Sequence, residues 1–283
     1  VDIKFEIGMA FEQLGAFKQA EKYYQESLNK IYALRGSKEG QELKILDQIP
    51  GEEVLNLRMA EVQNQLGQYS RAYENLKNIK NPESLSERDQ IERIQLAASL
   101  MDKRGETESA ARYLTELLKT WSGIPQLVAD PYYQLAQIEI KQNKKKDAIT
   151  SLEKIDELMT DSQKVNPYIH EKSLQQLADL FEQTGQRDQQ VETLNQLLQT
   201  YEKSKPLSSW RYKLGMLYFE KGEMQKASEI WNDLKNDKND FWFKLSQEQL
   251  KGSEWKNDYK KYIKRIPAMA DPAASAAPAG GNK

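Results

Sequence analysis

The sequence contains no cysteine among its 283 residues, which excludes disulfide bonds, thiolate nucleophiles and cysteine-based zinc sites. Its single histidine, His170, argues against histidine triads and multi-histidine metal sites. Because His170 follows Asn166-Pro167-Tyr168 at an expected helix start, we interpret it as an ordinary residue on a helix face. P-loop, dinucleotide-binding and HExxH motifs are also missing. We therefore predict no catalytic, metal-binding or cofactor-binding residues.

Long apolar runs and an excess of charge of one sign are absent as well. No run approaches the roughly 18–20 apolar residues that a membrane-spanning helix needs. Lys and Arg number 41 against 43 Asp and Glu, so no net field favours nucleic acid or an anionic membrane. The start, Val1-Asp2-Ile3-Lys4-Phe5, is not a signal peptide. Because it lacks Met and falls directly into a helical pattern, we expect a piece of a longer chain, from either the cytoplasm or the periplasm.

What the sequence does contain is a repeat, whose chemistry recurs at fixed offsets around six turn residues: Gly15, Gly67, Gly105, Asn143, Gly185 and Gly222. Seven residues before each turn stands a small residue: Gly8, Ala60, Ala98, Ala136, Ala178 and Gly215. Five residues after it stand Ala20, Ala72, Ala110, Ala148, Gln190 and Ala227. Small residues allow helices to cross closely, and apolar residues accompany them in steps of three to four. The pattern predicts two antiparallel amphipathic helices around each turn.

The first and last repeats carry the fullest pattern: Ile7-Gly8, Phe11, Gly15, Phe17, Ala20 and Tyr24, then Leu214-Gly215, Tyr218, Gly222, Ala227 and Trp231. At these residues the chain resembles the tetratricopeptide repeat family. The resemblance implies an all-α fold, a right-handed α-solenoid of about six helix-turn-helix repeats over residues 1–236. The turns are 52, 38, 38, 42 and 37 residues apart, whereas the family period is about 34. Additional residues are therefore expected between repeats, chiefly from Arg35 to Glu52.

A C-terminal pair of capping helices is predicted for residues 237–266. The first helix opens near Asp240, Gly252-Ser253 breaks it, and Ser253 is the expected N-cap of the second helix. The second helix places Trp255, Tyr259, Tyr262 and Ile263 on one face, with lysines largely opposite. Terminal repeats need a polar outer surface, which this pair would supply. Residues 267–283, rich in Pro, Ala and Gly, are expected to be a flexible tail.

Two basic clusters have structural explanations. Lys141, Lys144, Lys145 and Lys146 crowd a helix end, where positive charge stabilises the helix by about 0.3–1 kcal/mol. The lysines of the predicted cap alternate with aromatics, a combination that could also dock an acidic partner or RNA. Because those aromatics recur at core spacing, we favour the capping role.

The family resemblance also implies a function. In tetratricopeptide arrays the first helix of each repeat lines a concave surface that commonly receives an extended peptide or a helix. We therefore expect a non-enzymatic, bacterial-style scaffold or adaptor that binds another protein, without nucleic acid or a cofactor. When this geometry is transferred to the chain, the concave surface includes Phe5, Met9, Leu57, Glu61, Gln95 and Ser99. The partner-binding centre is predicted in repeats four to six, at Tyr133, Gln137, Gln175, Asp179, Tyr212, Met216 and Phe219.

Three alternatives remain open at this level. Tyr212 and Phe219 could pack between neighbouring helices instead of facing a ligand. The chain could be a structural spacer that docks through its ends, with Trp255 and Tyr259 in contact with a neighbouring domain. An enzyme that uses carboxylates on the inner face would have at least one acid with a strongly shifted pKa in a deep pocket. A clamp for a C-terminal carboxylate is disfavoured, because Phe5 and Met9 stand where basic and amide side chains would be needed.

Overall fold

The computed structural model describes residues 2–36, 51–122, 124–162, 165–203, 207–236 and 241–265. These residues form α-helices joined by short turns, and they include no β-strand, which confirms the all-α prediction. The chain divides into two compact units, unit 1 over Val1–Thr184 and unit 2 over Gly185–Lys283. The insertion expected after Arg35 and the expected tail at 267–283 lie outside the described residues, apart from the ends of the insertion.

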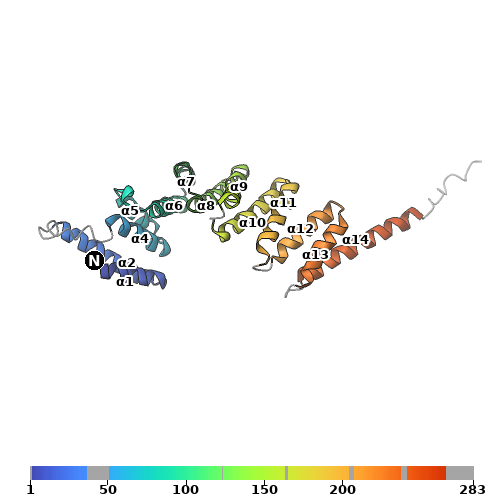
Figure 1. The fold of residues 1–283 in the computed structure, drawn as a ribbon, viewed down its shortest axis with the longest axis horizontal. Coiled ribbons are helices and arrows are strands. Elements are labelled where there is room, and N and C mark those ends of the chain that lie inside the picture. The colour runs from blue at the N-terminus through green and yellow to red at the C-terminus, as the bar shows by residue number, and fades with distance from the viewer. Residues whose placement is uncertain are drawn as a thin grey trace, which may run out of the picture. The chain divides into compact units, whose positions relative to one another are not determined.

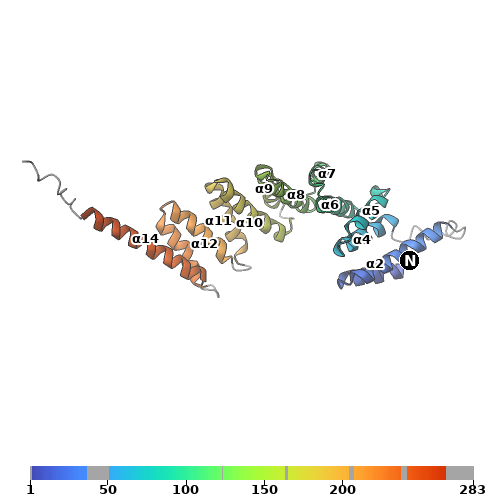
Figure 2. The ribbon, with the colours of Figure 1, turned by 180° about the vertical axis from the view of Figure 1, so that it is seen from behind.

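Unit 1 is a series of helical hairpins, which follow one another in chain order in Figures 1 and 2. The hairpins pair α1 with α2, α4 with α5, α6 with α7 and α8 with α9, and α10 packs against α9. A 3-10 turn at Pro82–Ser84 precedes the third hairpin. The helices are α1 (Asp2–Gln13), α2 (Phe17–Arg35), α4 (Glu52–Gln65), α5 (Tyr69–Asn78), α6 (Glu87–Lys103), α7 (Thr107–Trp121), α8 (Pro125–Lys141), α9 (Lys145–Ser162) and α10 (Pro167–Thr184).

The six predicted turns are confirmed by their backbone conformation. Every turn residue lies between two helices and has a positive φ, from 58° at Asn143 to 84° at Gly105. Glycine adopts this conformation freely, and asparagine is among the few other residues that tolerate it. At the first turn the amide of Gly15 donates to the Glu12 carbonyl at 2.9 Å, and the next amide, of Ala16, donates to the Phe11 carbonyl at 2.8 Å. These bonds satisfy carbonyls that the end of a helix would leave unpaired.

The small residues before the turns mark tight helix crossings, as predicted. A Cβ atom added to Gly8 would lie 2.6 Å from Tyr24 Cε1, and one added to Gly215 would lie 2.1 Å from Trp231 Nε1. Both distances are far below van der Waals contact, so the aromatic ring occupies the space that a side chain would need. The equivalent residues of the middle repeats are buried alanines: Ala60, Ala98, Ala136 and Ala178.

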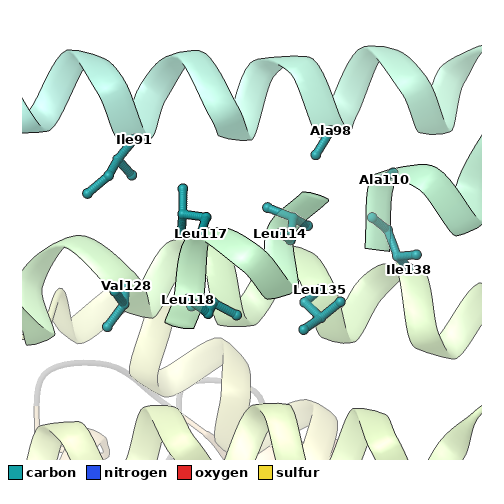
Figure 3. Packing of buried hydrophobic residues seen from close by; sticks show 9 residues of the cluster. All are labelled: Ile91, Ala98, Ala110, Leu114, Leu117, Leu118, Val128, Leu135 and Ile138. Atoms are coloured by element: carbon teal, nitrogen blue, oxygen red, sulfur yellow. The ribbon is translucent and has the colours of Figure 1, made fainter. Parts of the chain in front are cut away.

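The core between these helices is narrow and is shared by consecutive hairpins. One cluster joins Ile91 and Ala98 of α6, Leu114 and Leu117 of α7, and residues of α8 that include Leu135. Figure 3 shows Ile91 and Ala98 pointing from α6 toward the side chains of α7. Burial of one such leucine stabilises the fold by about 1.5–3 kcal/mol. Each hairpin therefore depends on its neighbours for part of its apolar core.

Unit 2 is organised around Trp231, which is completely buried. The ring stacks on Tyr212 at 5.7 Å between centroids, and its Nε1 donates to the Tyr212 carbonyl at 3.1 Å. Arg211 ties the same helices together, since its guanidinium binds Glu202 through two nitrogens and Asp233 through a third at 2.6 Å. The elements are α11 (Arg187–Tyr201), α12 (Ser208–Glu220), α13 (Met224–Asn232), a 3-10 turn (Asp233–Asn236) and α14 (Phe241–Arg265).

The predicted C-terminal helix pair is wrong, because α14 is one continuous helix of 25 residues. Glycine inside a helix costs only about 0.5–1 kcal/mol relative to alanine, and good helix formers such as Lys251 and Leu250 surround Gly252. Ser253 does not cap a helix, since it lies inside α14 with its Oγ 3.9 Å from Met224 Sδ. In Figures 1 and 2, α14 continues past α12 and α13.

A candidate protein-binding surface on the first helices

The first helices of consecutive hairpins in unit 1 are linked by polar contacts. Lys103 Nζ donates to Asn64 Oδ1 at 2.6 Å, which links α6 to α4. Gln134 Nε2 donates to the Gln95 carbonyl at 3.0 Å, which links α8 to α6. Both pairs are separated by 39 residues, which is close to the spacing of the turns, so the first helices of consecutive hairpins are in contact. Half-buried side chains stand on these helices six residues before each turn, and we call this row the first-helix surface: Met9, Glu61, Ser99, Gln137 and Asp179.

An open pocket of about 560 Å³ lies at the N-terminal end of the first-helix surface. Its apolar part comes from Met9 of α1 and Phe17 of α2, and the remaining wall is polar. Three helices, α1, α4 and α6, contribute the charged groups. The lining residues are Met9, Glu12, Gln13, Phe17, Arg58, Glu61, Asn64, Gln65 and Glu92.

Arg58 is the centre of the charges in this pocket. Its Nη1 donates to Glu61 Oε2 at 2.7 Å and lies 3.9 Å from Glu92 Oε2, while Nη2 lies 3.7 Å from Asp89 Oδ1. Glu12, a further carboxylate of the pocket, accepts a hydrogen bond from the Tyr24 hydroxyl. One cation thus faces several carboxylates, and the pocket favours a ligand that brings hydrogen-bond donors or positive charge.

Glu61 has a strongly shifted pKa. Burial raises the pKa of this carboxyl from 4.5 to about 7, against the opposing effect of Arg58, and the charges of Glu92 and Glu12 raise it further. Desolvation disfavours the charged form of an acid, which explains the direction. The charge of the pocket therefore changes near neutral pH.

The middle of the first-helix surface is lined mainly by amides. The predicted residues Tyr133 and Gln137 of α8 and Gln175 and Asp179 of α10 are all half-buried, and α8 contacts α10. Gln176 Nε2 donates to Gln137 Oε1 at 3.1 Å, which joins the two helices. Amide side chains offer both donors and acceptors, which suits recognition of a peptide backbone. Gln137 is thus joined to α10, the helix that carries Gln175 and Asp179.

The other three predicted residues, Tyr212, Met216 and Phe219, lie on α12 in unit 2. All three pack against the cluster around Trp231. Phe219 lies 5.8 Å from the Trp231 ring, and Tyr212 lies 5.3 Å from the ring of Trp242 on α14. Burial raises the pKa of the Tyr212 hydroxyl, while a hydrogen bond with Gln249 lowers it. These side chains fill space between helices and keep only part of their surface accessible.

Two residues assigned to the surface, Phe5 and Leu57, are core residues instead, with 8% and 0% exposure. They stand three positions before Gly8 and Ala60, the residues of the helix crossing, and side chains three apart share a helix face. His170 is also misassigned as an ordinary face residue. It is 2% exposed and its Nε2 lies 2.8 Å from Asp156 Oδ1.

The sequence reasoning did not identify the Arg58 pocket as a site. Charged residues on amphipathic helices usually form a solvated face, and this default concealed the cluster. A signal was nevertheless present, because Glu61 stands six residues before Gly67, on the row that also contains Met9 and Gln137. Arg58 precedes it by three residues on the same helix face.

Comparison with known proteins supports the repeat assignment. A model of the tetratricopeptide repeat family matches residues 1–29 and 129–158, which correspond to the first and fourth hairpins. These two hairpins match tetratricopeptide repeats by sequence. No protein of curated function matches it by sequence. None of its described helices is long and apolar enough to cross a bilayer.

Solved structures resemble this chain over most of its length. BtubC (BKLC) from P. vanneervenii is 15% identical, with a TM-score of 0.56 over 94% of this chain and 99% of that one. A tetratricopeptide repeat protein from Parabacteroides merdae is 16% identical, with a TM-score of 0.50 over 94% of this chain and 93% of that one. At this level of identity the likeness concerns the fold. Tetratricopeptide repeats are generally non-enzymatic interaction modules, so this fold supports a protein-interaction scaffold in general terms.

Proposed function

We propose that this tetratricopeptide repeat chain is an adaptor that holds a peptide or a helix of a partner protein on its first-helix surface. The observation that supports this most directly is the half-buried row itself, which gives every repeat of unit 1 a partly accessible side chain at the same position. A regular row matches the regular spacing of side chains along an extended or helical ligand. The proposed contacts are Tyr133, Gln137, Gln175 and Asp179 in unit 1, with Tyr212, Met216 and Phe219 in unit 2.

Within unit 1 the two parts of this surface suit different parts of a ligand. The amides of Gln137 and Gln175 can exchange hydrogen bonds with a backbone, which supplies orientation. The pocket around Arg58 and Glu61 offers an apolar wall from Met9 and Phe17 beside charged groups. Buried anchors of this kind contribute most of the binding energy at many interfaces. We assign anchoring to the pocket and backbone recognition to the amide row.

A shifted carboxyl such as Glu61 also fits an enzyme, but its environment favours a binding role. Arg58 holds this carboxyl in an ion-pair network that also includes Asp89 and Glu92. Structural ion-pair networks shift pKa values without catalysis. The Arg58 and Glu61 pair is therefore part of a recognition pocket.

The experiment begins with capture of partners on the immobilised chain and identification of the bound protein. Affinity for that purified partner is then measured for the chain and for Tyr133→Ala combined with Gln137→Ala. We expect at least a tenfold loss, about 1.4 kcal/mol, with unchanged helicity by circular dichroism. Tyr212→Ala, measured by itself, tests whether α12 of unit 2 contributes to partner binding.

Trp255→Ala combined with Tyr259→Ala on α14 is the matched control, because both side chains are exposed aromatics outside the first helices. Adaptor binding should survive this change. If affinity is kept by the α8 variant and lost in the α14 variant, the chain is a spacer that docks through its end, and the proposed surface is wrong.

A further inference from the structure

The pocket around Arg58 contains more negative charge than its own cation neutralises. Among its lining residues Arg58 alone is cationic, while three carboxyl groups come from three first helices: Glu12 of α1, Glu61 of α4 and Glu92 of α6. Asp89 of α6 adds a fourth, with Oδ1 3.7 Å from Arg58 Nη2. One positive charge therefore stands against four carboxyl groups.

The neighbouring groups that the structure describes do not remove this excess. Arg88 donates to Glu92 Oε1 at 3.0 Å, but its side chain is 79% exposed, so solvent screens much of its charge. Lys103 donates to an amide on the pocket wall. The Tyr24 hydroxyl that binds Glu12 adds a donor without a charge. The pocket therefore remains electronegative.

One carboxylate oxygen in the pocket has no donor among the described residues. Glu92 Oε2 is buried and accepts no hydrogen bond from them, since Arg58 Nη1, at 3.9 Å, is beyond hydrogen-bond distance. A buried carboxylate oxygen without a donor costs free energy. The side chains of Glu61 and Glu92 keep only 22% and 26% of their surface exposed, so they attract a cation more strongly than carboxylates on an open surface. A ligand with a cationic donor satisfies both groups.

The same pocket offers an apolar wall. Met9 of α1 and Phe17 of α2 are half-buried and line it beside the carboxyl groups. Its volume of about 560 Å³ lies within the range of ligand pockets, roughly 300–1,000 Å³. Lysine and arginine combine an aliphatic stem with a cationic end, which matches an apolar wall beside carboxylates. A bare metal ion would leave that wall uncovered.

Given the adaptor function proposed above, on which this inference rests, we propose that the pocket around Arg58 binds a lysine or arginine side chain of the partner peptide. The charged end of that side chain contacts Glu61 and Glu92, and its stem lies along Met9 and Phe17. The carboxylates repel an acidic residue in its place, and an apolar residue leaves Glu92 Oε2 without a donor. The partner is therefore recognised by a basic anchor.

Binding of the basic side chain is coupled to the proton of Glu61. Burial first, and then the charges of Glu92 and Glu12, raise the pKa of this carboxyl to about 7 against the opposing effect of Arg58. A bound cation favours the charged carboxylate, so the pKa of Glu61 falls in the complex. Affinity is therefore full above pH 7 and weakens as the pH falls below it, by up to about tenfold per pH unit.

A defined peptide library tests the anchor before any partner is known. Acetylated and amidated heptapeptides carry lysine, arginine, norleucine or glutamate at the central position, and the other positions are randomised among uncharged residues. We expect the immobilised chain at pH 7.5 to retain the lysine and arginine pools at least tenfold more than the norleucine pool, which has an apolar stem without the charge. Equal retention of the norleucine pool overturns the proposal.

Two double variants with the same change in net charge locate the effect. Glu61→Gln combined with Glu92→Gln should abolish the preference for basic pools, because it removes two carboxylates of the pocket. Glu6→Gln combined with Glu83→Gln removes two exposed carboxylates outside the pocket and should keep the preference. Circular dichroism checks that both variants fold. A preference that falls equally in both variants reports only the net charge of the chain and contradicts the proposal.

The pH dependence of a retained basic peptide gives a readout on the unmodified chain. Its dissociation constant should rise at least tenfold from pH 7.5 to pH 5.5, whereas Glu61→Gln should bind weakly at both pH values. An affinity of the parent that is the same at both pH values contradicts the proposal. Spermidine, a free polyamine, should not displace the peptide at equal concentration. If it does, the pocket selects free amines rather than a partner's side chain, and the proposal is wrong.

The outcomes also separate the basic anchor from the adaptor function. If the retained peptides show no basic preference but lose affinity in Tyr133→Ala combined with Gln137→Ala, the adaptor function stands and the basic anchor is wrong. If no pool is retained, the adaptor function and the basic anchor both fail.

Discussion

The repeats at the two ends of the array and those in its middle cross their helices in different ways. The first and sixth repeats pair a glycine with a large aromatic ring, Gly8 with Tyr24 and Gly215 with Trp231. The repeats between them place a buried alanine, such as Ala98, at the same position, with Leu114 or an equivalent leucine on the second helix. The glycine leaves space for a large ring, so these two repeats bury more apolar area where their own two helices cross than the alanine repeats do.

Gly215→Ala tests this difference and should cause the largest loss of stability. The new Cβ would fall 2.1 Å from Trp231 Nε1, so the ring must move and its hydrogen bond to the Tyr212 carbonyl is lost. Overpacking costs about 1–3 kcal/mol or more, and the bond adds about 1 kcal/mol. We expect a loss of about 3 kcal/mol in urea unfolding followed by circular dichroism.

Two controls accompany that measurement. Gly252→Ala changes a helical glycine with open space around it and should stabilise α14 by up to about 1 kcal/mol. Trp231→Leu in the Gly215→Ala background converts the end crossing into the middle type. A coupling of at least about 1 kcal/mol between the two substitutions is expected, and simple additivity would show that the ring does not occupy the space assigned to it.

The surface of unit 1 shows a second contrast, between the charged pocket at its N-terminal end and the amides of its middle. The pKa of Glu61 is about 7 in the folded chain against an ordinary value of 4.5, so the folded protein binds more protons between these values. Its stabilising contribution is complete below pH 4.5 and is lost as the pH rises to 7. At about 1.4 kcal/mol per pH unit, and with part of the side chain accessible, we expect an effect of about 1–3 kcal/mol.

Urea midpoints at pH 5 and pH 8 measure this effect. Glu61→Gln should be more stable than the parent at pH 8. The difference between its urea midpoints at the two pH values should be much smaller than the difference for the parent. Glu6→Gln, at an exposed carboxylate on α1, is the control and should follow the parent. A Glu61→Gln variant that keeps the full pH dependence would assign that dependence to other groups.

These contrasts also show what could be predicted from the sequence. The turns were predictable because a backbone with positive φ restricts the residue type, and the same residues recur six times. The continuity of α14 was not predictable. Gly252 carries a local penalty of about 1 kcal/mol, which the surrounding residues of high helix propensity overcome. The Arg58 pocket depends on side chains from three helices, and Phe5 and Leu57 were misplaced because an offset from the turn does not fix how far a side chain is buried.

Within the middle repeats, Ala98→Gly tests whether alanine gives a more stable helix crossing than glycine does. The substitution leaves the helix contact possible but lowers helix propensity by about 0.5–1 kcal/mol and removes a methyl group that is fully buried. We expect a total loss of about 1–1.5 kcal/mol in the same urea assay, well below that of Gly215→Ala. A gain in stability would mean that Leu114 can close onto glycine and that the choice between the two crossings is not set by packing.

The smallest effect is expected at the fourth turn, where a middle repeat departs from the others by using Asn143 in place of glycine. Asn143 has φ 58°, a conformation that costs an ordinary L-residue about 1–2 kcal/mol and asparagine less. Asn143→Gly removes the remaining strain but adds backbone freedom to the unfolded chain, so the two effects nearly cancel and we expect a change of about 0.5 kcal/mol or less.

Asn143→Ala keeps the strain without the asparagine side chain and should lose about 1 kcal/mol. Gly105→Ala should lose at least as much stability as Asn143→Ala, and thermal melts rank the three variants of these two turns on one scale. If Asn143→Ala melts with the parent, the turn is held by the packing of α8 on α9 rather than by the residue at its apex.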